Sequence, residues 1–382
     1  MIDTVILTIP VSHTWIQEPD KFQPSLRGLK DVIERGLGAR LFAKYTYNMP
    51  KSEGYYPRLT VTLRWDKGYQ LFLKIEFSIP KLLFGNSLDE VEDKDFDEVV
   101  NILKNKLSEM GIRIFTEQLK NALVSAIHYS KNILLSKPYT ASMVIKNLGK
   151  LDVTKRLELN HRHFQNEGHA LYFDSGSYQI VIYDKIKDLA KTNRHSVDKD
   201  KTSKQLDLFN YLKENKIPLE VLRLEVRLTK KTKLNSLFRE LGFVTNPTFE
   251  QVFSKDKAQS VVSHYWNFIT QDKNLFMLRF SDTDLLKQVI DFQKLSGKKL
   301  SVIETLGLAQ IITYSKEFGL RNLRNTLCTH YSERTWFRLN KFFNLIEQIT
   351  SQRDNFGFIN DIEQALLTFE PYRTKSEGEH FS

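Results

Sequence analysis

The sequence predicts an α+β domain over residues 1–245, followed by an all-α domain over residues 246–382. In the first part, several segments alternate apolar and polar side chains with the period of two that is typical of β-strands, and turn residues separate them. After about residue 246, apolar side chains recur at helical spacing. The 382 residues are enough for two domains with cores of their own. We expect the boundary at Asn246–Pro247.

The clearest strand signal is a hairpin over residues 58–79. Both arms alternate apolar and polar residues, and the turn at residues 66–68 contains a glycine that can take positive φ. Pro80 ends the second arm, because proline has no amide hydrogen to donate to a neighbouring strand. An acidic run over residues 89–95 then favours the start of a helix, since carboxylates stabilise a helix N-terminus.

The remaining elements follow from the same two periodicities. Further strands are predicted over residues 4–9, 151–163 and 219–228, and in a second hairpin over residues 169–185. Helices of the first part are predicted over residues 96–110, 116–130, 205–214 and 233–242, with a mobile loop over residues 192–204. Helices of the second part are predicted over residues 250–268, 281–295, 301–318, 320–328 and 333–349.

The composition excludes several classes of protein. Hydrophobic residues make up 41% and charged residues 27%, which excludes a disordered tail, a coiled-coil rod and a disulfide mini-scaffold. No apolar run approaches the roughly 18–20 residues of a transmembrane helix, and the first residues do not resemble a signal peptide. The single cysteine, Cys328, excludes an internal disulfide and a multi-cysteine metal site. We therefore expect a cytoplasmic protein of a reducing compartment.

The positive charge is concentrated in the middle of the chain. The net charge is +10, and residues 131–245 alone carry 22 basic and 13 acidic side chains. The flanking parts are nearly balanced, with 17 basic and 17 acidic residues before this segment and 17 and 16 after it. A local basic excess indicates a site for a polyanion such as a nucleic acid. A solvated, lysine-rich surface without such a partner explains the charge equally well.

Two predicted strands carry charged side chains at alternate positions. Arg223, Glu225 and Arg227 share one face of their strand, and Arg156 shares a face with Glu158. If the two strands are adjacent, two carboxylates and several arginines gather on one face of the sheet. This pattern is typical of a functional site, but a solvent-facing ladder of salt bridges would produce it as well.

His161 and His163 are a candidate pair of metal ligands, because their spacing in a strand places both rings on one face. In a regular strand, however, they share that face with Leu157 and Leu159, so a bulge would be needed to bring them beside Glu158. We therefore rank Glu158 above either histidine as a ligand.

Tyr183 is a candidate nucleophile. Tyrosine has a pKa of ~10, so forming the phenolate at pH 7 costs about 4 kcal/mol. A metal ion on a scissile phosphate and a nearby lysine could offset this cost, and Lys185 and Lys187 follow closely. The alternative is an ordinary packed tyrosine with its hydroxyl at the edge of the core.

Short blocks of the first 245 residues occur in an order that is similar to a known family. They are an opening Met-Ile-Asp with VILTIP, KIEFSIPKLLFGNSLDEV at residues 74–91, TKRLELN at 154–160, QIVIYDKIKDL at 179–189 and VLRLEVRL at 221–228. The ordered set resembles the gene II replication initiators of filamentous phages and, more distantly, the Rep proteins of staphylococcal rolling-circle plasmids. In this resemblance the family's acids fall on Glu158 and Glu225, and its DNA-linking tyrosine falls on Tyr183.

The resemblance implies a relaxase-type, HUH-like endonuclease fold with an antiparallel sheet flanked by helices. It implies that Tyr183 attacks one phosphodiester of the double-strand origin, forms a 5′-phosphotyrosine and frees a 3′-hydroxyl primer. The strand is resealed after one round of copying. Mg²⁺ or Mn²⁺ is the implied cofactor. Its ligands stay open among Glu158, Glu225, His161 and His163, since such folds normally use the histidine pair whereas the gene II pattern has an acid nearby.

The implied partners are origin DNA, single-stranded at the nick, and a helicase and polymerase of a bacterial host. Nonspecific DNA affinity would come from exposed basic side chains. The candidates are Arg156, Arg223, Arg227 and Lys187. In the helical part, the segment 301–349 has the rhythm of a helix-turn-helix around Gly319, which adds Arg321, Arg324, Arg334 and Arg338 as DNA-binding candidates. A plain helical bundle is the competing interpretation of that segment.

Two other functions compete with the initiator. A non-catalytic, sequence-specific DNA-binding regulator would use only the C-terminal helices, and Tyr183 would then have no role in cleavage. A tyrosine recombinase fits less well, because such enzymes need no metal and carry their tyrosine near the C-terminus. The oligomeric state and the origin sequence do not follow from the sequence.

Overall fold

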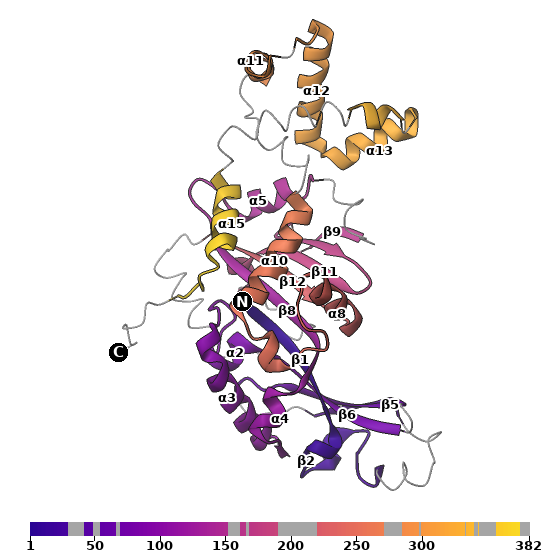
Figure 1. Cartoon of the computed structure of the whole chain (residues 1–382), viewed down its shortest axis with the longest axis vertical. Helices are drawn as coiled ribbons and strands as arrows, with labels where there is room; N and C mark the ends of the chain where they lie inside the picture. Colours follow the sequence, from indigo (N-terminus) through magenta and orange to yellow (C-terminus); the bar gives the residue numbers. More distant parts are fainter. Residues whose placement is uncertain are drawn as a thin grey trace.

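The computed structural model describes residues 1–29, 42–48, 54–65, 69–151, 161–165, 168–189, 220–270, 285–297, 299–332, 334–339, 343 and 357–374. Its centre is a ten-stranded sheet in the order β3-β4-β5-β6-β1-β8-β12-β11-β10-β9, with antiparallel pairing at every neighbour (Figure 1). Helices pack around this sheet. The α+β class and the antiparallel sheet are confirmed.

The strands of the large sheet are β1 (Ile2–Pro10), β3 (Phe22–Gln23), β4 (Lys44–Tyr47), β5 (Arg58–Trp65), β6 (Tyr69–Ser78), β8 (Leu123–Leu134), β9 (His161–Gln165), β10 (Ala170–Asp174), β11 (Tyr178–Asp184) and β12 (Val221–Leu228). A separate two-stranded sheet pairs β2 (Trp15–Ile16) with β7 (Ile112–Arg113). The predicted hairpins at residues 58–79 and 169–185 are confirmed as β5–β6 and β10–β11. The turn at residues 66–68 lies outside the described residues.

The helices are α2 (Ile79–Phe84), α3 (Phe96–Glu109), α4 (Thr116–Lys120), α5 (Ala141–Leu148), α6 (Lys185–Leu189), α8 (Lys231–Glu240), α9 (Phe249–Val252), α10 (Lys255–Thr270), α11 (Leu285–Ser296), α12 (Val302–Phe318), α13 (Leu320–His330) and α15 (Gly357–Thr368). Most of the predicted helices are therefore present. Of the predicted helix 333–349, residues 334–339 and 343 are described and helical. The predicted loop 192–204, the helix 205–214 and most of the strand 151–163 lie outside the described residues.

The helix predicted over residues 116–130 is wrong. The α4 helix ends at Lys120, and the following residues form the long strand β8. This strand pairs with β1 on one side and with β12 on the other. Within it, the side chains of Val124, Ile127 and Tyr129 are completely buried. Pairing on both sides with burial of these side chains outweighs the helical spacing of the local sequence.

The two faces of the sheet differ, as the period of two requires. Along β1, Val5, Leu7 and Ile9 point into the hydrophobic core and are at most 2% exposed. The alternate residues Thr4 and Thr8 lie on the opposite face, which we call the open face. The core face is covered by helices, since α8 and α10 contact both β8 and β12, and α15 contacts β8. Functional side chains on the sheet must therefore lie on the open face or at its ends.

The expected boundary at Asn246–Pro247 does not interrupt the packing. The amide of Val124 in β8 donates to the carbonyl of Pro247 at 3.0 Å. Further on, the ring of Tyr265 in α10 lies 5.2 Å from the ring of Tyr178 in β11. Residues on both sides of the boundary thus share one core, whereas α11, α12 and α13 lie beyond the end of the sheet (Figure 1). The domain division itself stays a prediction.

This shared core predicts a large stability loss when Tyr265 is truncated. Tyr265 is 2% exposed, so Tyr265→Ala should lower the free energy of unfolding by about 3–5 kcal/mol, the usual cost of removing a buried ring. Urea unfolding measures the change. Leu367→Ala is the control, because Leu367 is 73% exposed and should shift stability by no more than about 0.5 kcal/mol. Equal small effects would show that α10 does not stabilise the sheet.

Candidate active site

The charged residues of β12 lie in the interior of the protein. Arg223, Glu225 and Arg227 share the open face of β12, as their spacing predicts, because β12 runs between β11 and β8. Arg223 and Glu225 are each only 1% exposed. This burial excludes the solvent-facing ladder of salt bridges that the sequence left open. Buried charges need specific partners, and those partners define the site.

Glu225 is the centre of these contacts. Its Oε1 accepts a hydrogen bond from Nε of Arg227 at 2.7 Å, and its Oε2 accepts one from the hydroxyl of Tyr183 at 2.9 Å. Nδ1 of His128 lies 3.5 Å from Oε1. Burial alone would raise the pKa of Glu225, but the charges of Arg227 and His128 and the hydrogen bond from Arg227 lower it. Glu225 is therefore a carboxylate that accepts from a phenol.

Tyr183 is a neutral phenol in this environment. It lies on β11 directly opposite Arg223 and is 8% exposed. Burial, followed by the negative charge of Glu225, raises the pKa of Tyr183 well above its ordinary value of 10. Arg223 acts in the opposite direction but does not compensate. The phenol is thus hydrogen-bonded to a base and needs added positive charge to ionise.

Lys185 lies close to Tyr183, as the sequence suggests. Its Nζ is 5.6 Å from the centroid of the Tyr183 ring and donates to Oγ of Ser87 at 3.0 Å. Lys185 is buried, so its charge acts on the phenol through a medium of low dielectric. Lys187 points elsewhere. It is half exposed and contacts Oγ of Ser142 at 3.3 Å, so it remains available to a phosphate outside the site.

Arg223 does not fit the expected role of a DNA-binding residue. Its Nε donates to Asn132 at 2.6 Å, its Nη1 to Asp3 at 2.9 Å and its Nη2 to the carbonyl of Ser87 at 2.7 Å. These acceptors come from β8, from β1 and from the segment after α2. Because all three donor groups are used inside the protein, Arg223 positions the site instead of contacting a phosphate. Arg227 is partly exposed and donates to Glu225 and Gln179.

A cluster of potential metal ligands surrounds Glu225. Ligand atoms of Asp3, His128 and Glu225 all lie within 4.8 Å of one another. Burial opposes ionisation of Asp3, but Arg223, Lys185 and His128 together hold the pKa of this carboxyl well below its usual range. Two carboxylates and an imidazole suit Mn²⁺ well and Mg²⁺ acceptably. The residues therefore fit the implied metal.

The sequence did not indicate Asp3 or His128. His128 falls in the segment that was predicted as a helix, and its significance comes only from its place in β8 opposite Thr4 and Arg227. Asp3 lies at an irregularity in the pairing of β1 with β8, between Ile2 and Thr4. The sequence offered one signal for Asp3, which is that it is a charged residue within a run of strand-forming residues.

The histidine pair does not adjoin Glu225. His161 and His163 are in β9, at the edge of the sheet, and β10 and β11 lie between β9 and β12. Three strand spacings correspond to about 14 Å. The side chains of this pair, and the whole of Arg156 and Glu158, lie outside the described residues. Their roles as ligands or DNA contacts stay predictions.

The segment that follows α2, which includes Ser87 and Glu90, is held against the site by hydrogen bonds. Glu90 accepts hydrogen bonds from the amide of Asn132 and from Nζ of Lys131, both at 2.6 Å. The amide of Tyr372, beyond α15, donates to Glu90 at 2.9 Å, and the amide of Glu90 donates back to the carbonyl of Tyr372 at the same distance. The segment that presents Ser87 to Arg223 and Lys185 is thus fastened both to β8 and to the end of α15.

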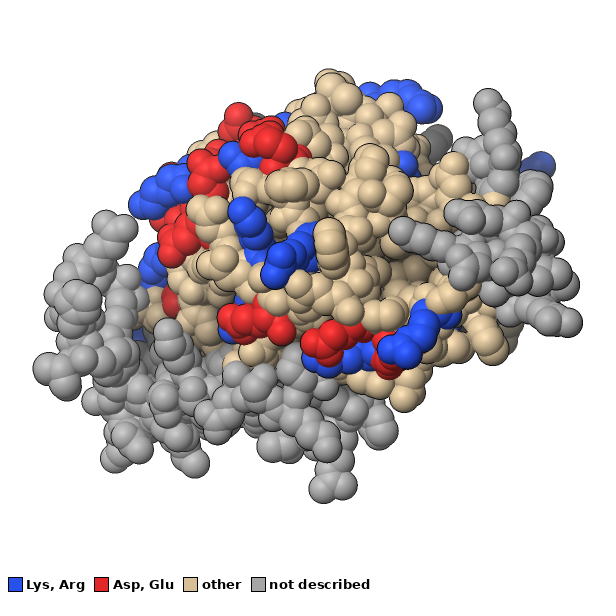
Figure 2. All heavy atoms as spheres, turned by 90° about the horizontal axis from the view of Figure 1, so that it is seen from below, with Lys and Arg blue, Asp and Glu red and all other residues tan. Residues whose placement is uncertain are grey.

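The described surface gives no single basic face in the view of Figure 2. Lysines and arginines alternate there with acidic side chains, among wide uncharged areas. Residues 190–219, which the structure does not describe, contain seven lysines and arginines and four acidic residues. Arg321 and Arg324 lie one turn apart on α13, far from β12 in Figure 1. A helix-turn-helix role for α12 and α13 stays a prediction, as does that of Arg334 and Arg338.

A profile of a known protein family matches the first 245 residues of the chain. The profile that matches residues 1–245 describes the N-terminal region of the replication-associated gene II protein. The chain belongs to this family. This match confirms the resemblance to the gene II initiators. The matched region also contains Asp3, His128 and Glu225. Neither the curated proteins nor the solved structures provide a match. Within the described residues, no helix is both long and apolar enough to cross a membrane.

The contacts of Glu90 predict acid sensitivity. Burial alone would raise the pKa of Glu90, but the N-terminal ammonium, Lys131 and the hydrogen bonds from Lys131 and Tyr372 lower it from 4.5 to about 2. The folded state therefore gains stability from this group above pH 4.5 and loses it as the pH falls towards 2. The loss should be about 3 kcal/mol, measured by urea unfolding at a series of pH values.

Two variants isolate this effect from that of other carboxyl groups. Glu90→Gln should be less stable than the wild type at pH 7, and the difference should shrink steadily below pH 4.5. Glu370→Gln is the control, because the Glu370 side chain is 71% exposed and should behave like the wild type throughout. A Glu90→Gln difference that is independent of pH would contradict the lowered pKa.

Proposed function

We propose that this chain is a rolling-circle replication initiator that nicks one strand of origin DNA through Tyr183 and later rejoins it. The family supports a role in replication, since its profile covers residues 1–245. The observation that carries the nicking step is the 2.9 Å hydrogen bond from Tyr183 to Glu225 Oε2 within the buried cluster. A hydroxyl held by a carboxylate has the geometry of a nucleophile with its general base.

The proposed step is an exchange of one phosphodiester for another. The Tyr183 oxygen forms a bond to the scissile phosphorus while the bond from phosphorus to the 3′-oxygen breaks. The phenol proton passes to Glu225 Oε2 and from there, through water, to the departing 3′-oxygen, so Glu225 returns to its carboxylate form. The products are a 5′-phosphotyrosine and a free 3′-hydroxyl, and attack of a 3′-hydroxyl on the phosphotyrosine reverses the reaction and rejoins the strand.

The electrostatics of the resting site explain why the reaction would need a cation. The pKa of Tyr183 is raised and that of Glu225 is lowered, so proton transfer between them is unfavourable without further charge. Lys185, 5.6 Å from the ring centroid, supplies one positive charge. Such buried charge stabilises a developing phenolate more strongly than an exposed lysine would.

Asp3, His128 and Glu225 are the residues that would hold Mg²⁺ or Mn²⁺. A divalent ion there would polarise the scissile phosphate and favour the ionised phenol. The two oxygens of Glu225 would have different roles. Oε1, which faces His128 and Arg227, would bind the metal ion, whereas Oε2 accepts from Tyr183 and would take its proton. Lys187 and Arg227 are the partly exposed cations near the site that a DNA phosphate could reach.

The nicking step is tested by Tyr183→Phe on a supercoiled plasmid that carries the DNA flanking the gene. We expect the wild type to give open-circular product with covalently attached protein in Mg²⁺ or Mn²⁺. Tyr183→Phe should lose at least about 10³-fold in rate, because phenylalanine has no nucleophile. Tyr172→Phe is the matched control, since Tyr172 lies on the neighbouring strand β10 and should cleave normally.

Different outcomes point to different functions. Cleavage by Tyr183→Phe would show that the protein is a nickase but that another residue is its nucleophile. Binding of flanking DNA by the wild type without any cleavage would favour the non-catalytic regulator. Thermal melting of each variant shows that loss of the hydrogen bond to Glu225 has not unfolded the protein.

The metal cluster is tested by Mn²⁺ binding without DNA. His128→Ala removes one ligand while leaving both carboxylates in place, and it should weaken Mn²⁺ binding at least about 10-fold in titration calorimetry. His169→Ala is the matched control, because His169 contacts Ser142 outside the cluster. Equal affinity in both variants, or no Mn²⁺ binding by the wild type, would remove these residues as the metal site.

A further inference from the structure

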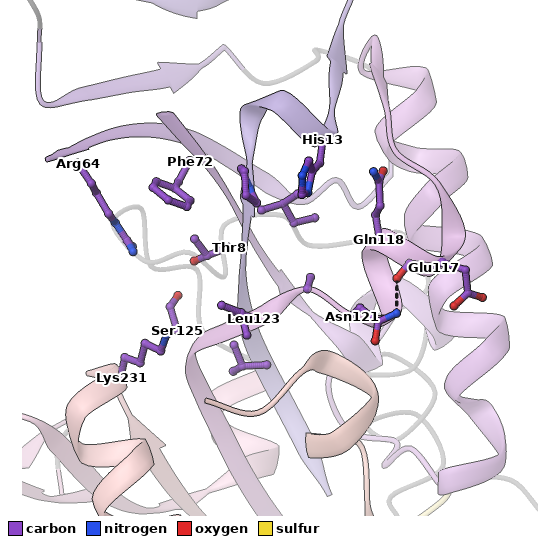
Figure 3. Close-up of a pocket in the computed structure, with 14 residues that line it drawn as sticks. Thr8, His13, Arg64, Phe72, Glu117, Gln118, Asn121, Leu123, Ser125 and Lys231 are labelled. Carbon is purple, nitrogen blue, oxygen red and sulfur yellow. Dashed lines mark hydrogen bonds between the residues drawn. The ribbon is translucent and has the colours of Figure 1, made fainter. Parts of the chain in front are cut away.

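A cavity opens on the sheet away from Glu225. It has a volume of about 430 Å³ and is shown in Figure 3. Residues of β1, β5, β6, β8, α4 and α8 line it, and this volume is typical of sites for small organic groups. None of its lining residues belongs to the cluster around Glu225. We call it the Phe72 pocket.

The Phe72 pocket and the Glu225 cluster lie on the same face of the sheet. Thr4 and Thr8 point to the open face of β1, since they are four positions apart along the strand. Thr4 pairs with His128 of the cluster, whereas Thr8 lines the pocket. Four residues of a strand span about 13 Å. One ligand of extended shape could therefore occupy both places.

The lining of the Phe72 pocket combines an aromatic face with a cation. The guanidinium of Arg64 lies over the Phe72 ring, with its central carbon 4.9 Å from the ring centroid. Figure 3 shows these two side chains on one side of the cavity, with Thr8 between Phe72 and Leu123. The apolar side chain of Leu123, which pairs with Thr8, forms part of the wall. Such a surface suits a flat aromatic group that carries an anion on one side.

Positive charge gathers beside the pocket. Lys44, Arg64 and Lys74 lie on neighbouring strands of the open face, and burial together with repulsion from Arg64 and Lys44 lowers the pKa of Lys74. Glu76 offsets this repulsion only in part. Lys231 lines the pocket from α8, and Glu117 is the one acid of its lining. Crowded cations with few acidic neighbours favour the binding of phosphate groups.

We propose that the Phe72 pocket holds an unstacked base of single-stranded DNA, a few nucleotides from the phosphate cleaved at Tyr183. The base stacks on Phe72, and the adjoining phosphates contact Arg64, Lys74 and Lys231. Aromatic faces beside a basic groove are the usual means by which proteins bind single strands. The inference rests on the proposed function, because it takes the strand at Tyr183 to be the ligand.

The test is the binding of two fluorescein-labelled probes, measured by anisotropy without metal so that no cleavage occurs. One probe is an oligothymidylate of about 20 nucleotides, and the other is an abasic strand of the same length. Phe72→Ala should weaken binding of the oligothymidylate roughly 5- to 100-fold and binding of the abasic strand less than about 2-fold. Phe72→Tyr should retain the wild-type affinity.

One control variant completes the test. Phe115→Ala is the control, since Phe115 is 77% exposed and does not line the pocket. Thermal melting confirms that each variant is folded.

The outcomes separate the pocket from the proposed function. If the wild type binds the oligothymidylate but Phe72→Ala binds it equally well, or if Phe72→Ala weakens both probes alike, the pocket does not hold a base. The nicking reaction would then still stand. If the wild type binds neither probe, both the pocket and the proposed initiator are overturned.

Discussion

The site depends on one buried arginine. Arg223 is 1% exposed, and a charge at such a position is tolerated only when all its donor groups have partners. The partners are Asp3 of β1, Asn132 of β8 and the carbonyl of Ser87. Three segments far apart in the sequence must therefore be in place together. Removing one of them would leave a buried charge without compensation, so the site and the centre of the sheet form as a unit.

The same burial sets the chemistry of the neighbouring pair. Tyr183 and Glu225 are buried, so their hydrogen bond and the charges around it act more strongly than they would at the surface. Glu225 is held ionised by Arg227 and His128, while Tyr183 is held protonated by burial and by Glu225 itself. The resting site is thus arranged for proton transfer but lacks the positive charge that would make the transfer favourable. A phosphate with its counter-ion would change this balance.

The two faces of the sheet have different roles, since one face forms the hydrophobic core and the other carries the candidate site. The core face is apolar and is covered by helices, including α10 and α15 from the second part of the chain. The open face carries the cluster around Glu225 and, farther along β1, the Phe72 pocket. The C-terminal end also reaches the site indirectly, because Tyr372 holds Glu90, and Glu90 holds β8. Tyr372, in the second part of the chain, therefore helps to hold the candidate site in place.

The amino-acid sequence by itself determined the features that depend on neighbouring residues. The alternation along β12 placed Arg223, Glu225 and Arg227 on one face, because successive side chains of a strand point in opposite directions. The order of short blocks indicated the family, and spacing along the chain placed Lys185 near Tyr183. Tertiary structure decided the rest. The segment of β8 became a strand because β1 and β12 pair with it on both sides, a contact that no local pattern reveals. The order of strands places β1, β8 and β12 side by side, and this brings Asp3 and His128 close to Glu225. The same order places β9, with His161 and His163, at the edge of the sheet.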